Sequence, residues 1–332
     1  MRFYRAIKHS KRRFNELYEN YGMSGCKWFY VADYLICFFI LGASWKDYFG
    51  YGFYEKRWNG RSKYITFRRF FKLLKICNQE KYVKYLRDKS LFNERYADVL
   101  HRDTLDLTLC TKESFVMFWE SHPAVFVKEV LGFRGNSVWF YETKDEDASA
   151  IYNQLINDKN SHYVIESKLE QNEALAAFHP SSVNTIRIVT IYDDAKDVVH
   201  FMFAKLRMGN HGAHLDNTHA GGISGNIDLD TGIINTPGYS VTSTEEYIYH
   251  PYTGKQIIGF QVPYWKECKL FIEKAARVTP EVRYVGWDVV ILQDGNFALI
   301  EANDNADHDG QQIHYRGMWK EYKNIVKQLK RF

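Results

Sequence analysis

The sequence has few cysteines, and their positions exclude several classes of site. Five cysteines are scattered through 332 residues, and no two of them form a C-x-x-C pair. An odd, dispersed set of this kind argues against a disulfide framework and a zinc site, and it favours a reducing compartment. The basic first residues are not followed by the apolar core and small-residue cleavage site of a signal peptide. We therefore expect a cytoplasmic protein.

Long apolar runs are also lacking. The most apolar segment, 28–45, contains Asp33, and its unbroken core covers only 34–42. A membrane-spanning helix needs roughly 20 apolar residues. The segment therefore predicts a buried helix, and peripheral attachment to an anionic membrane is the alternative.

Acidic residues are scarce at the start of the chain. Residues 1–75 hold 16 Lys and Arg against 5 Asp and Glu, a net charge of +11, so the remainder carries −7 of the total of +4. Apolar residues such as Phe67, Phe70 and Phe71 recur at helical spacing among the basic ones. We predict a mostly helical N-terminal region, 1–85. Its basic surface is either solvated or able to contact an anionic membrane, and nucleic acid is not the partner that we favour.

Two apolar runs further along the chain predict a β-hairpin. Residues 289–292 and 297–300 flank the turn sequence Gln-Asp-Gly-Asn. Pairing about this turn brings Asp288 beside Glu301, and the two-residue period of a strand places Glu301 and Asn303 on one face. Two carboxylates and an amide oxygen are ligands that Mg²⁺ prefers, and such a site usually completes its shell with substrate phosphates. The alternative is a solvated, acidic hairpin end.

A lysine and a glycine-containing turn form a second candidate site. The predicted strand 124–128 ends in Lys128, and Gly132, Gly135 and Ser137 follow before the next predicted strand. Glycines let backbone amides approach an anion, and the lysine adds a positive charge. The segment is not a Walker A loop, because the Gly-Lys-Ser/Thr ending is missing. We predict a hairpin whose loop covers a phosphate group.

Basic residues form a third pattern. Arg187 lies in a predicted strand, and the strand that begins at 198 leads to Lys205 and Arg207. Alternation allows these cations to share a sheet face, next to a glycine-rich segment that contains Asn217 and His219. Such a cluster favours phosphate binding, although an arginine in a strand more often pairs with a neighbouring strand.

Taken together, these blocks resemble the ATP-grasp ligases. The motifs are N-T-x-R at 184–187, D-N-x-H-x-G-G at 216–222, D-L-x-T-G at 228–232, G-W-D at 286–288 and E-x-N at 301–303. Their combination is similar to the sugar-transfer-associated branch, which is related to the ribosomal-protein glutamate ligases. The resemblance runs from about Lys89 to Asp307. It implies an α+β ATP-grasp fold in which two lobes grip ATP: a nucleotide lobe, 86–165, and a catalytic lobe with a C-terminal helix, 166–332.

The resemblance also implies roles for individual residues. The implied Mg²⁺ ligands are Asp288, Glu301 and Asn303; the implied ATP-binding residues are Lys89, Lys128, Gly132, Gly135, Ser137, Glu166, Lys168 and Lys205; the implied catalytic residues are Arg187, Arg207, Asn217 and His219. Glu166 is expected beside adenine, and either Glu170 or Glu173 beside ribose. His219 either accepts a proton from the amine or is a structural loop residue.

The implied activity is ATP-dependent carboxylate–amine ligation through an acyl phosphate, with ADP and phosphate as products. The expected partners are a small-molecule carboxylate and an amine or sugar acceptor, in the assembly of a cell-surface polysaccharide precursor. Two alternatives stay open. One is an ATP-grasp kinase that phosphorylates a sugar or small alcohol, and the other is a non-catalytic protein that binds a membrane surface or nucleic acid.

The chain departs from the family patterns at three places, and the departures at Gly286 and after Asn303 leave the acceptor open. Asn184 stands where an Asp is expected, and Gly286 stands where D-alanine ligases have an arginine. Asp304 follows Asn303, where the glutamate ligases usually continue toward Pro-Gly. The positive charge on phosphate is then expected from Arg187 and Arg207.

Overall fold

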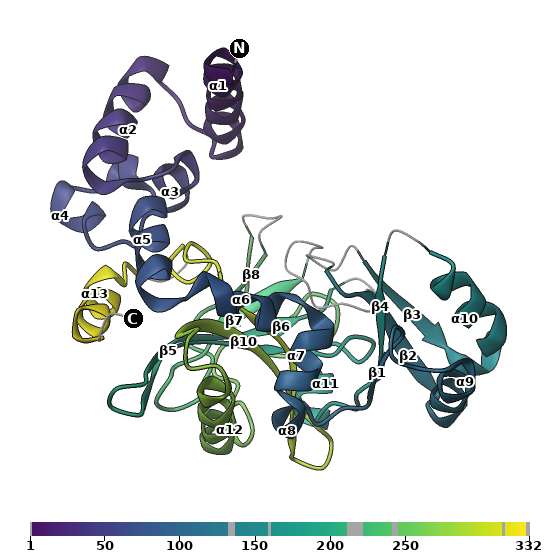
Figure 1. The fold of residues 1–332 in the computed structure, drawn as a ribbon. Coiled ribbons are helices and arrows are strands. Elements are labelled where there is room, and N and C mark those ends of the chain that lie inside the picture. The colour runs from purple at the N-terminus through teal and green to yellow at the C-terminus, as the bar shows by residue number, and fades with distance from the viewer. Residues whose placement is uncertain are drawn as a thin grey trace. The chain divides into compact units, whose positions relative to one another are not determined.

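The computed structural model describes residues 2–131, 137–158, 161–210, 222–240, 245–313 and 316–329. The chain packs into two compact units: unit 1 combines Met1–Cys77 with Asp307–Phe332, and unit 2 is Asn78–Ala306 (Figure 1). The lobe boundaries predicted after residues 85 and 165 stay predictions. By packing, the residues from Asp307 onward belong with the N-terminal helices.

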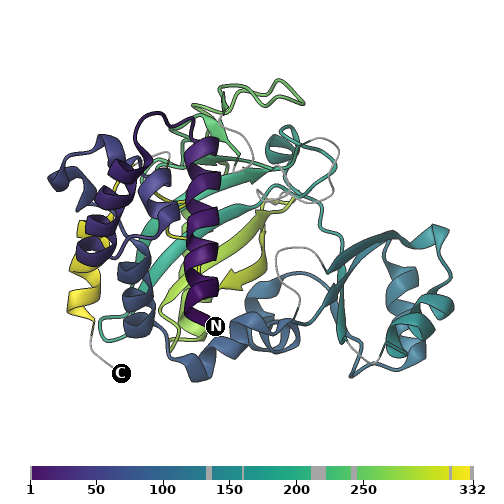
Figure 2. The ribbon, with the colours of Figure 1, turned by 90° about the horizontal axis from the view of Figure 1, so that it is seen from above.

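The first half of unit 2 contains a four-stranded sheet. The sheet has the order β1-β4-β2-β3, and all its pairs are antiparallel. Figure 1 and Figure 2 show α9 and α10 on one face of this sheet. The elements are α6 (Glu80–Arg87), α7 (Lys89–Arg95), α8 (Ala97–Leu100), β1 (Thr104–Asp106), α9 (Lys112–Ser121), β2 (Ala124–Glu129), β3 (Val138–Glu142), η2 (Thr143–Asp145), α10 (Ala148–Ile156) and β4 (Tyr163–Ser167).

Strand alternation divides this smaller sheet into an apolar face and a polar face. Val125 and Val127 are fully buried in a cluster with Phe115 and Trp119 of α9. The residue between them, Phe126, pairs directly with Glu166 of β4. Directly paired residues project to the same side, so Glu166 lies on the face opposite α9 and α10.

A seven-stranded antiparallel sheet builds the second half of unit 2. Its strand order is β11-β10-β5-β6-β7-β8-β9. One face carries the largest apolar cluster, to which strand residues such as Ile188 and Trp287 and helix residues such as Cys268 and Ile272 contribute. The elements are α11 (Glu173–Ala176), β5 (Ile186–Asp193), β6 (Val198–Met208), β7 (Ile223–Asn226), β8 (Gly238–Tyr239), β9 (Glu246–Tyr247), α12 (Trp265–Val278), β10 (Tyr284–Ile291) and β11 (Phe297–Asn303).

The predicted hairpin is confirmed as β10 and β11. Asp288 pairs with Glu301, as the spacing predicts, and a β-bulge follows directly, because Val289 pairs with Leu299. The turn contains Gly295 at φ +84°, a conformation that side chains with a Cβ rarely adopt. The Asp-Gly turn sequence therefore sets the register of the two carboxylates.

The described residues of unit 1 fold into helices around an aromatic core. Phe14, Tyr34, Tyr48, Phe49 and Phe53 are among its buried members. The elements are α1 (Arg2–Asn20), α2 (Lys27–Leu41), α3 (Trp45–Gly50), η1 (Phe53–Glu55), α4 (Trp58–Arg61), α5 (Phe67–Cys77) and α13 (Trp319–Gln328).

The most apolar segment of the sequence forms α2, but the prediction that this helix is buried is right for one face only. Tyr34, Cys37 and Leu41 are buried, whereas Trp28 is 79% exposed and Phe39 is 70% exposed. Sequence composition could not separate the two faces, because both are apolar. Among the described residues, no helix has the length and apolar character needed to cross a membrane.

One buried amide joins the C-terminal segment to the N-terminal helices. The side-chain oxygen of Gln312 accepts hydrogen bonds from the backbone N–H of Ile65, at 2.9 Å, and of Met318, at 3.1 Å. Its nitrogen donates to the hydroxyl of Tyr51, at 3.0 Å, and to the backbone oxygen of His308, at 2.9 Å. Gln312 is fully buried. These contacts explain why residues far apart in the sequence form one unit.

We expect Gln312→Leu to destabilise unit 1 by about 3 kcal/mol, because two buried backbone N–H groups lose their acceptor at about 1–3 kcal/mol each. The exposed amide of Asn324, on α13, offers the control Asn324→Leu, which should change stability by less than about 0.5 kcal/mol. Urea denaturation followed by circular dichroism measures both. Equal midpoints for the two variants would contradict this account of the unit.

Candidate active site

A row of charged and polar side chains crosses the larger sheet on one face. Asp288 of β10 pairs with Glu301 of β11 on one side and with Arg187 of β5 on the other. Arg187 in turn pairs with Lys205 of β6, and Lys205 pairs with Asn226 of β7. Because directly paired residues project to the same side, strand register alone aligns all five. The neighbouring strand residues Trp287 and Ile188 project to the opposite, apolar face.

Asp288 is the centre of this row. It is only 2% exposed, and its carboxylate accepts hydrogen bonds from Arg187, with Nη2 at 2.8 Å and Nε closer, and from Nη1 of Arg207 at 2.7 Å. Burial alone would raise the pKa of Asp288, but the positive charges of Arg187 and Arg207 outweigh burial and hold the pKa well below its usual range. Asp288 is therefore ionised throughout the physiological pH range.

Glu301 is the second carboxylate of the row, in a different environment. Half of its side chain is exposed, at 51%, and Nη2 of Arg187 lies 3.7 Å from Oε1. Asn303 donates a hydrogen bond from Nδ2 to the same oxygen at 3.0 Å. The pKa of Glu301 is raised, first because surrounding protein displaces water from the carboxylate and second because Asp288 is negatively charged. A bound cation would relieve this repulsion.

The donor set of Asp288, Glu301 and Asn303 fits a hard divalent cation in its chemistry. Among the described residues, no three His, Cys, Asp or Glu side chains come close enough to hold a metal ion by themselves. An amide oxygen and oxygens from a substrate would have to complete the shell. This is how Mg²⁺ is usually bound where it bridges to phosphates.

A second charged group lies on the polar face of the smaller sheet. Glu166 is buried, and it accepts hydrogen bonds from Nζ of Lys128 and from Nη2 of Arg102, the latter at 3.0 Å. Burial would raise the pKa of Glu166, but the charges of Arg102 and Lys128 outweigh burial and lower it. The residues predicted for phosphate and for adenine therefore contact each other in this structure.

Lys89 extends this second group. It is the first residue of α7, and Asp88 caps that helix by accepting a hydrogen bond from the backbone N–H of Leu91 at 3.0 Å. The Lys89 ammonium donates to the backbone oxygen of Glu129 at 2.9 Å. Burial and the nearby charge of Lys128 lower the pKa of Lys89. The Asp-Lys pair thus begins a helix and also directs a cation toward β2.

Arg102 is the residue that the sequence analysis missed. Its side chain is 2% exposed, and Nη2 also lies 3.4 Å from Oδ1 of Asn93. Nε and Nη1 are buried without a hydrogen-bond partner among the residues that the structure describes. Buried guanidinium nitrogens without an acceptor are costly, so two of them beside Glu166 point to a ligand that supplies the acceptors. No sequence pattern surrounds Arg102, and its partner Glu166 is 64 residues away.

The remaining predicted residues have varied surroundings. Nζ of Lys205 lies 5.9 Å from the ring centre of Tyr239, and Nζ of Lys168 lies 5.6 Å from that of Phe140. Ser137 accepts a backbone hydrogen bond from Glu129 at 3.1 Å. Four further predictions, Gly132, Gly135, Asn217 and His219, lie outside the described residues.

The side chain of Asn184 is hydrogen-bonded to backbone groups in the protein interior. It is fully buried, and its Nδ2 donates to the backbone oxygens of Leu175, at 2.9 Å, and His179, at 3.1 Å. Its Oδ1 accepts from the backbone N–H of Gly209 at 3.1 Å. An amide both donates and accepts here, which an ionised Asp could not do. This explains the departure from the expected Asp.

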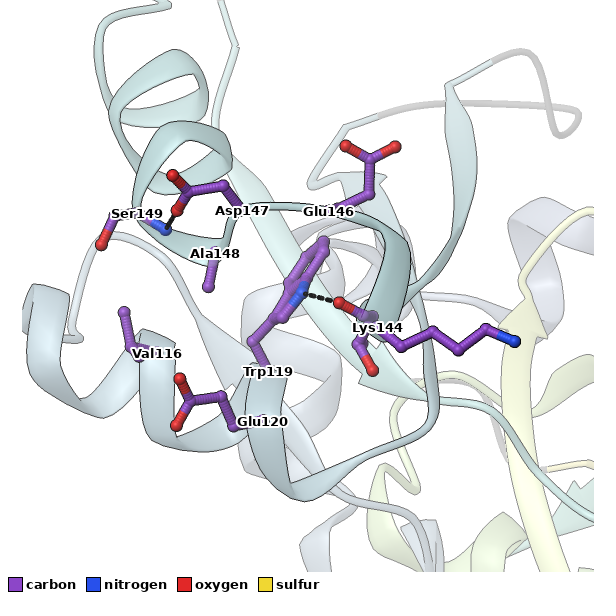
Figure 3. A pocket seen from close by; sticks show the side chains of 9 residues that line it. Val116, Trp119, Glu120, Lys144, Glu146, Asp147, Ala148 and Ser149 are labelled. Atoms are coloured by element: carbon purple, nitrogen blue, oxygen red, sulfur yellow. Dashed lines mark hydrogen bonds between the residues drawn. The ribbon is translucent and has the colours of Figure 1, made fainter.

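An open pocket near α9 and α10 contains none of the predicted residues. Val116, Trp119, Lys144 and Asp147 are among the residues that line it (Figure 3). Trp119 donates from Nε1 to the backbone oxygen of Thr143 at 3.2 Å. The pocket is lined by elements on the face of the smaller sheet opposite Glu166 and Lys128, so we do not assign it to the nucleotide.

Gly286 makes room for the side chain of Ala306. A Cβ on Gly286 would lie 2.5 Å from the Cβ of Ala306 and 3.4 Å from Cδ of Arg187. Carbon atoms 2.5 Å apart overlap, so a side chain here would displace its neighbours. The glycine that departs from the D-alanine ligase pattern thus leaves space for Ala306, while Arg187 would lie at ordinary contact distance from a side chain here.

We predict that Gly286→Ala destabilises the protein by about 1–3 kcal/mol, the usual cost of overpacking a dense site. Gly60→Ala is the control, because its Cβ would meet no atom closer than the Cβ of Lys56 at 3.7 Å. Denaturant unfolding of both variants gives the comparison. If Gly286→Ala were as stable as the control, the space at Gly286 would not be needed.

Comparisons with known proteins agree with this architecture. The family described as "Sugar-transfer associated ATP-grasp" matches residues 69–327. No curated protein matches the sequence significantly.

Several solved structures are similar to this chain at low identity. The ATP-grasp ligase PsnB, complexed with minimal precursor, Mg and ADP, is 14% identical, with a TM-score of 0.46 over 76% of this chain and 61% of that chain. D-alanyl-alanine synthetase A from Vibrio cholerae is 11% identical, with a TM-score of 0.42 over 74% and 62%. N5-carboxyaminoimidazole synthase from Aspergillus clavatus is 10% identical, with a TM-score of 0.44 over 70% and 48%. This chain therefore spans less than two thirds of each of those chains.

The family match, rather than these distant likenesses, carries the assignment. It covers well over half of the 332 residues and includes both sheets. The α+β fold with antiparallel sheets agrees with the predicted architecture. The chain belongs to the sugar-transfer-associated ATP-grasp family and has the ATP-grasp fold.

Proposed function

We propose that the protein is an ATP-dependent ligase that joins a carboxylate to an amine. The observation that carries the proposal is the row in which Asp288 lies between Glu301 and Arg187 and also contacts Arg207, in a chain of the ATP-grasp family. The carboxylates can bind the metal ion that accompanies a polyphosphate, and the guanidinium groups can bind its phosphate oxygens. Each negative phosphate oxygen would then face a cation. This leaves the polar face of the smaller sheet for the rest of the nucleotide.

The proposed metal site consists of Asp288, Glu301 and Asn303. Mg²⁺ bound there would neutralise charge on the ATP phosphates during transfer of the γ-phosphoryl group. Arg187 and Arg207 now neutralise Asp288, at 2.8 and 2.7 Å. When a cation takes over that task, we propose that the two guanidinium groups turn to the phosphoryl oxygens. The same residues then hold the resting site together and stabilise the transferring group.

The proposed nucleotide end consists of Lys89, Arg102, Lys128 and Glu166. Lys128 and Arg102 both bond to Glu166, so a bound nucleotide has to compete for them. The charges of all three cations lower the pKa of Glu166, so an anion bound beside it would meet three positive groups. The unpartnered nitrogens of Arg102 support its inclusion.

In the proposed reaction, an oxygen of the substrate carboxylate attacks the γ-phosphorus of ATP, and the bond to the ADP oxygen breaks. The amine nitrogen of the acceptor then attacks the acyl carbon, phosphate leaves, and the amine loses a proton. The chain supplies positioning and charge stabilisation rather than a nucleophile. We further propose that the acceptor belongs to a surface-polysaccharide precursor, a choice supported by the family's association with sugar transfer.

Product analysis tests the ligase proposal. We expect the protein, incubated with Mg-ATP, amino acids and uronic-acid or amino-sugar acceptors, to release ADP and phosphate and to form an amide that mass spectrometry detects. Hydroxylamine in place of the amine should give a hydroxamate, because it traps an acyl phosphate. Glu301→Gln should lower turnover by about two orders of magnitude, as removal of one electrostatic stabiliser usually does. Phosphate added to a sugar hydroxyl, without any hydroxamate, would contradict the proposal and favour the kinase.

Arg102 gives a second test of the site. We predict that Arg102→Met weakens ADP binding at least about tenfold, since a charged hydrogen bond to a ligand contributes about 1.5–3 kcal/mol. Arg95→Met is the matched control, because Arg95 on α7 bonds to the backbone oxygen of Val278, at 3.1 Å, rather than to Glu166. Calorimetric titration with ADP measures both affinities. Unchanged binding in a folded Arg102→Met protein would remove this residue from the site.

A further inference from the structure

One face of α2 is apolar and exposed along its whole length. The exposed residues recur at helical spacing, so they form a continuous stripe. We call this stripe the α2 apolar face, and its members are Trp28, Phe29, Leu35, Ile36, Phe39 and Ile40. Large exposed apolar patches are rare on soluble domains and usually mark an interaction surface.

The other face of the same helix is firmly packed. Tyr34, Cys37 and Leu41 belong to the buried aromatic core of unit 1. Gly42 ends the helix in a left-handed conformation, at φ +70°, and its backbone N–H bonds to Phe38 at 3.1 Å. The helix is thus held by its buried face, while the residues of the α2 apolar face stay exposed. Figure 1 shows the place of α2 among the helices of unit 1.

The negative charge on α2 is paired with a cation at the core side of the helix. Its single acidic residue, Asp33, accepts hydrogen bonds from Nη1 of Arg61, at 2.6 Å, and from the hydroxyl of Tyr48, at 2.8 Å. The Asp33 charge is thereby neutralised at the core side of the helix. The α2 apolar face itself carries no acidic residue.

Positive charge, in contrast, stands at both ends of α2. Lys27 is the first residue of the helix, with its Nζ 4.9 Å from the ring centre of Tyr18. At the other end, Nη2 of Arg68 donates to the backbone oxygen of Phe38 at 3.2 Å, and its guanidinium carbon lies 5.2 Å from the Phe38 ring centre. Both cations are exposed.

The charge of the whole of unit 1 has the same sign. Unit 1 holds 22 Lys and Arg residues against 8 Asp and Glu, a net charge of +14, whereas unit 2 carries −10. A strongly basic unit with an exposed apolar stripe is complementary to an anionic bilayer surface. Apolar residues enter the boundary of the acyl chains there while the cations stay among the headgroups.

We propose that unit 1 docks on anionic membranes through the α2 apolar face, with the helix lying in the plane of the bilayer surface. The 15 residues of α2 span roughly 22 Å, which is shorter than the hydrocarbon core, so the helix lies at the interface rather than across it. Trp28, which is 79% exposed, suits the headgroup level, where tryptophan is enriched. This inference does not depend on the proposed ligase activity.

Sedimentation of the full chain with lipid vesicles tests the proposal, in the absence of nucleotide. We expect binding to vesicles of phosphatidylcholine with 30% phosphatidylglycerol, roughly tenfold or more weaker binding to phosphatidylcholine alone, and loss of binding in high salt. The double variant Ile36→Glu and Phe39→Glu should weaken binding to the anionic vesicles at least about tenfold, because two charges would have to enter the apolar boundary.

The control is Leu270→Glu, since Leu270 of α12 is an exposed leucine, at 59%, in unit 2. It should bind vesicles as the unmodified chain does. Thermal unfolding shows whether each variant is folded. We expect all of them to fold, because the substituted residues are exposed. Wild-type binding by the folded double variant, or no binding by the unmodified chain, would overturn the proposal. An oligomer that the double variant converts to monomers, with vesicle binding absent, would instead assign the face to a second copy of the chain.

Discussion

The ion pairs of Asp288 are the interaction on which the candidate site depends. A buried carboxylate is tolerated only when cations or hydrogen-bond donors surround it. Asp288 meets this condition through Arg187 and Arg207, which come from two other strands of the same sheet. Strand register places Arg187 directly beside Asp288. A change in any of these features would leave a charge buried without a partner.

The sequence predicts most of this part of the site because the site follows local rules. An Asp-Gly turn and two apolar runs were enough to place Asp288 opposite Glu301. Alternation along the strands was enough to put Arg187, Lys205 and Arg207 on one face. The sequence did not predict which carboxylates these cations contact. These contacts depend on packing between strands that are distant in the sequence.

Three features could not be predicted from the sequence, because each depends on contacts in the folded structure. Arg102 is recognisable only by its burial and by its bond to Glu166 of another strand. Gln312 joins segments that lie at opposite ends of the chain. The exposed face of α2 has the same composition as its buried face, so periodicity of the sequence could not distinguish them. In each case the three-dimensional partner, rather than the residue type, determines the role.

We propose, as the central claim, that the carboxylates beside Arg187 and Arg207 belong to a metal-dependent nucleotide site. Calorimetric titration of the unmodified protein with ADP, with and without Mg²⁺, tests it most directly. We expect ADP to bind, and to bind more tightly when Mg²⁺ is present, because the cation would replace the arginines as the partner of Asp288. Absence of ADP binding, or an affinity that Mg²⁺ does not change, would contradict the claim.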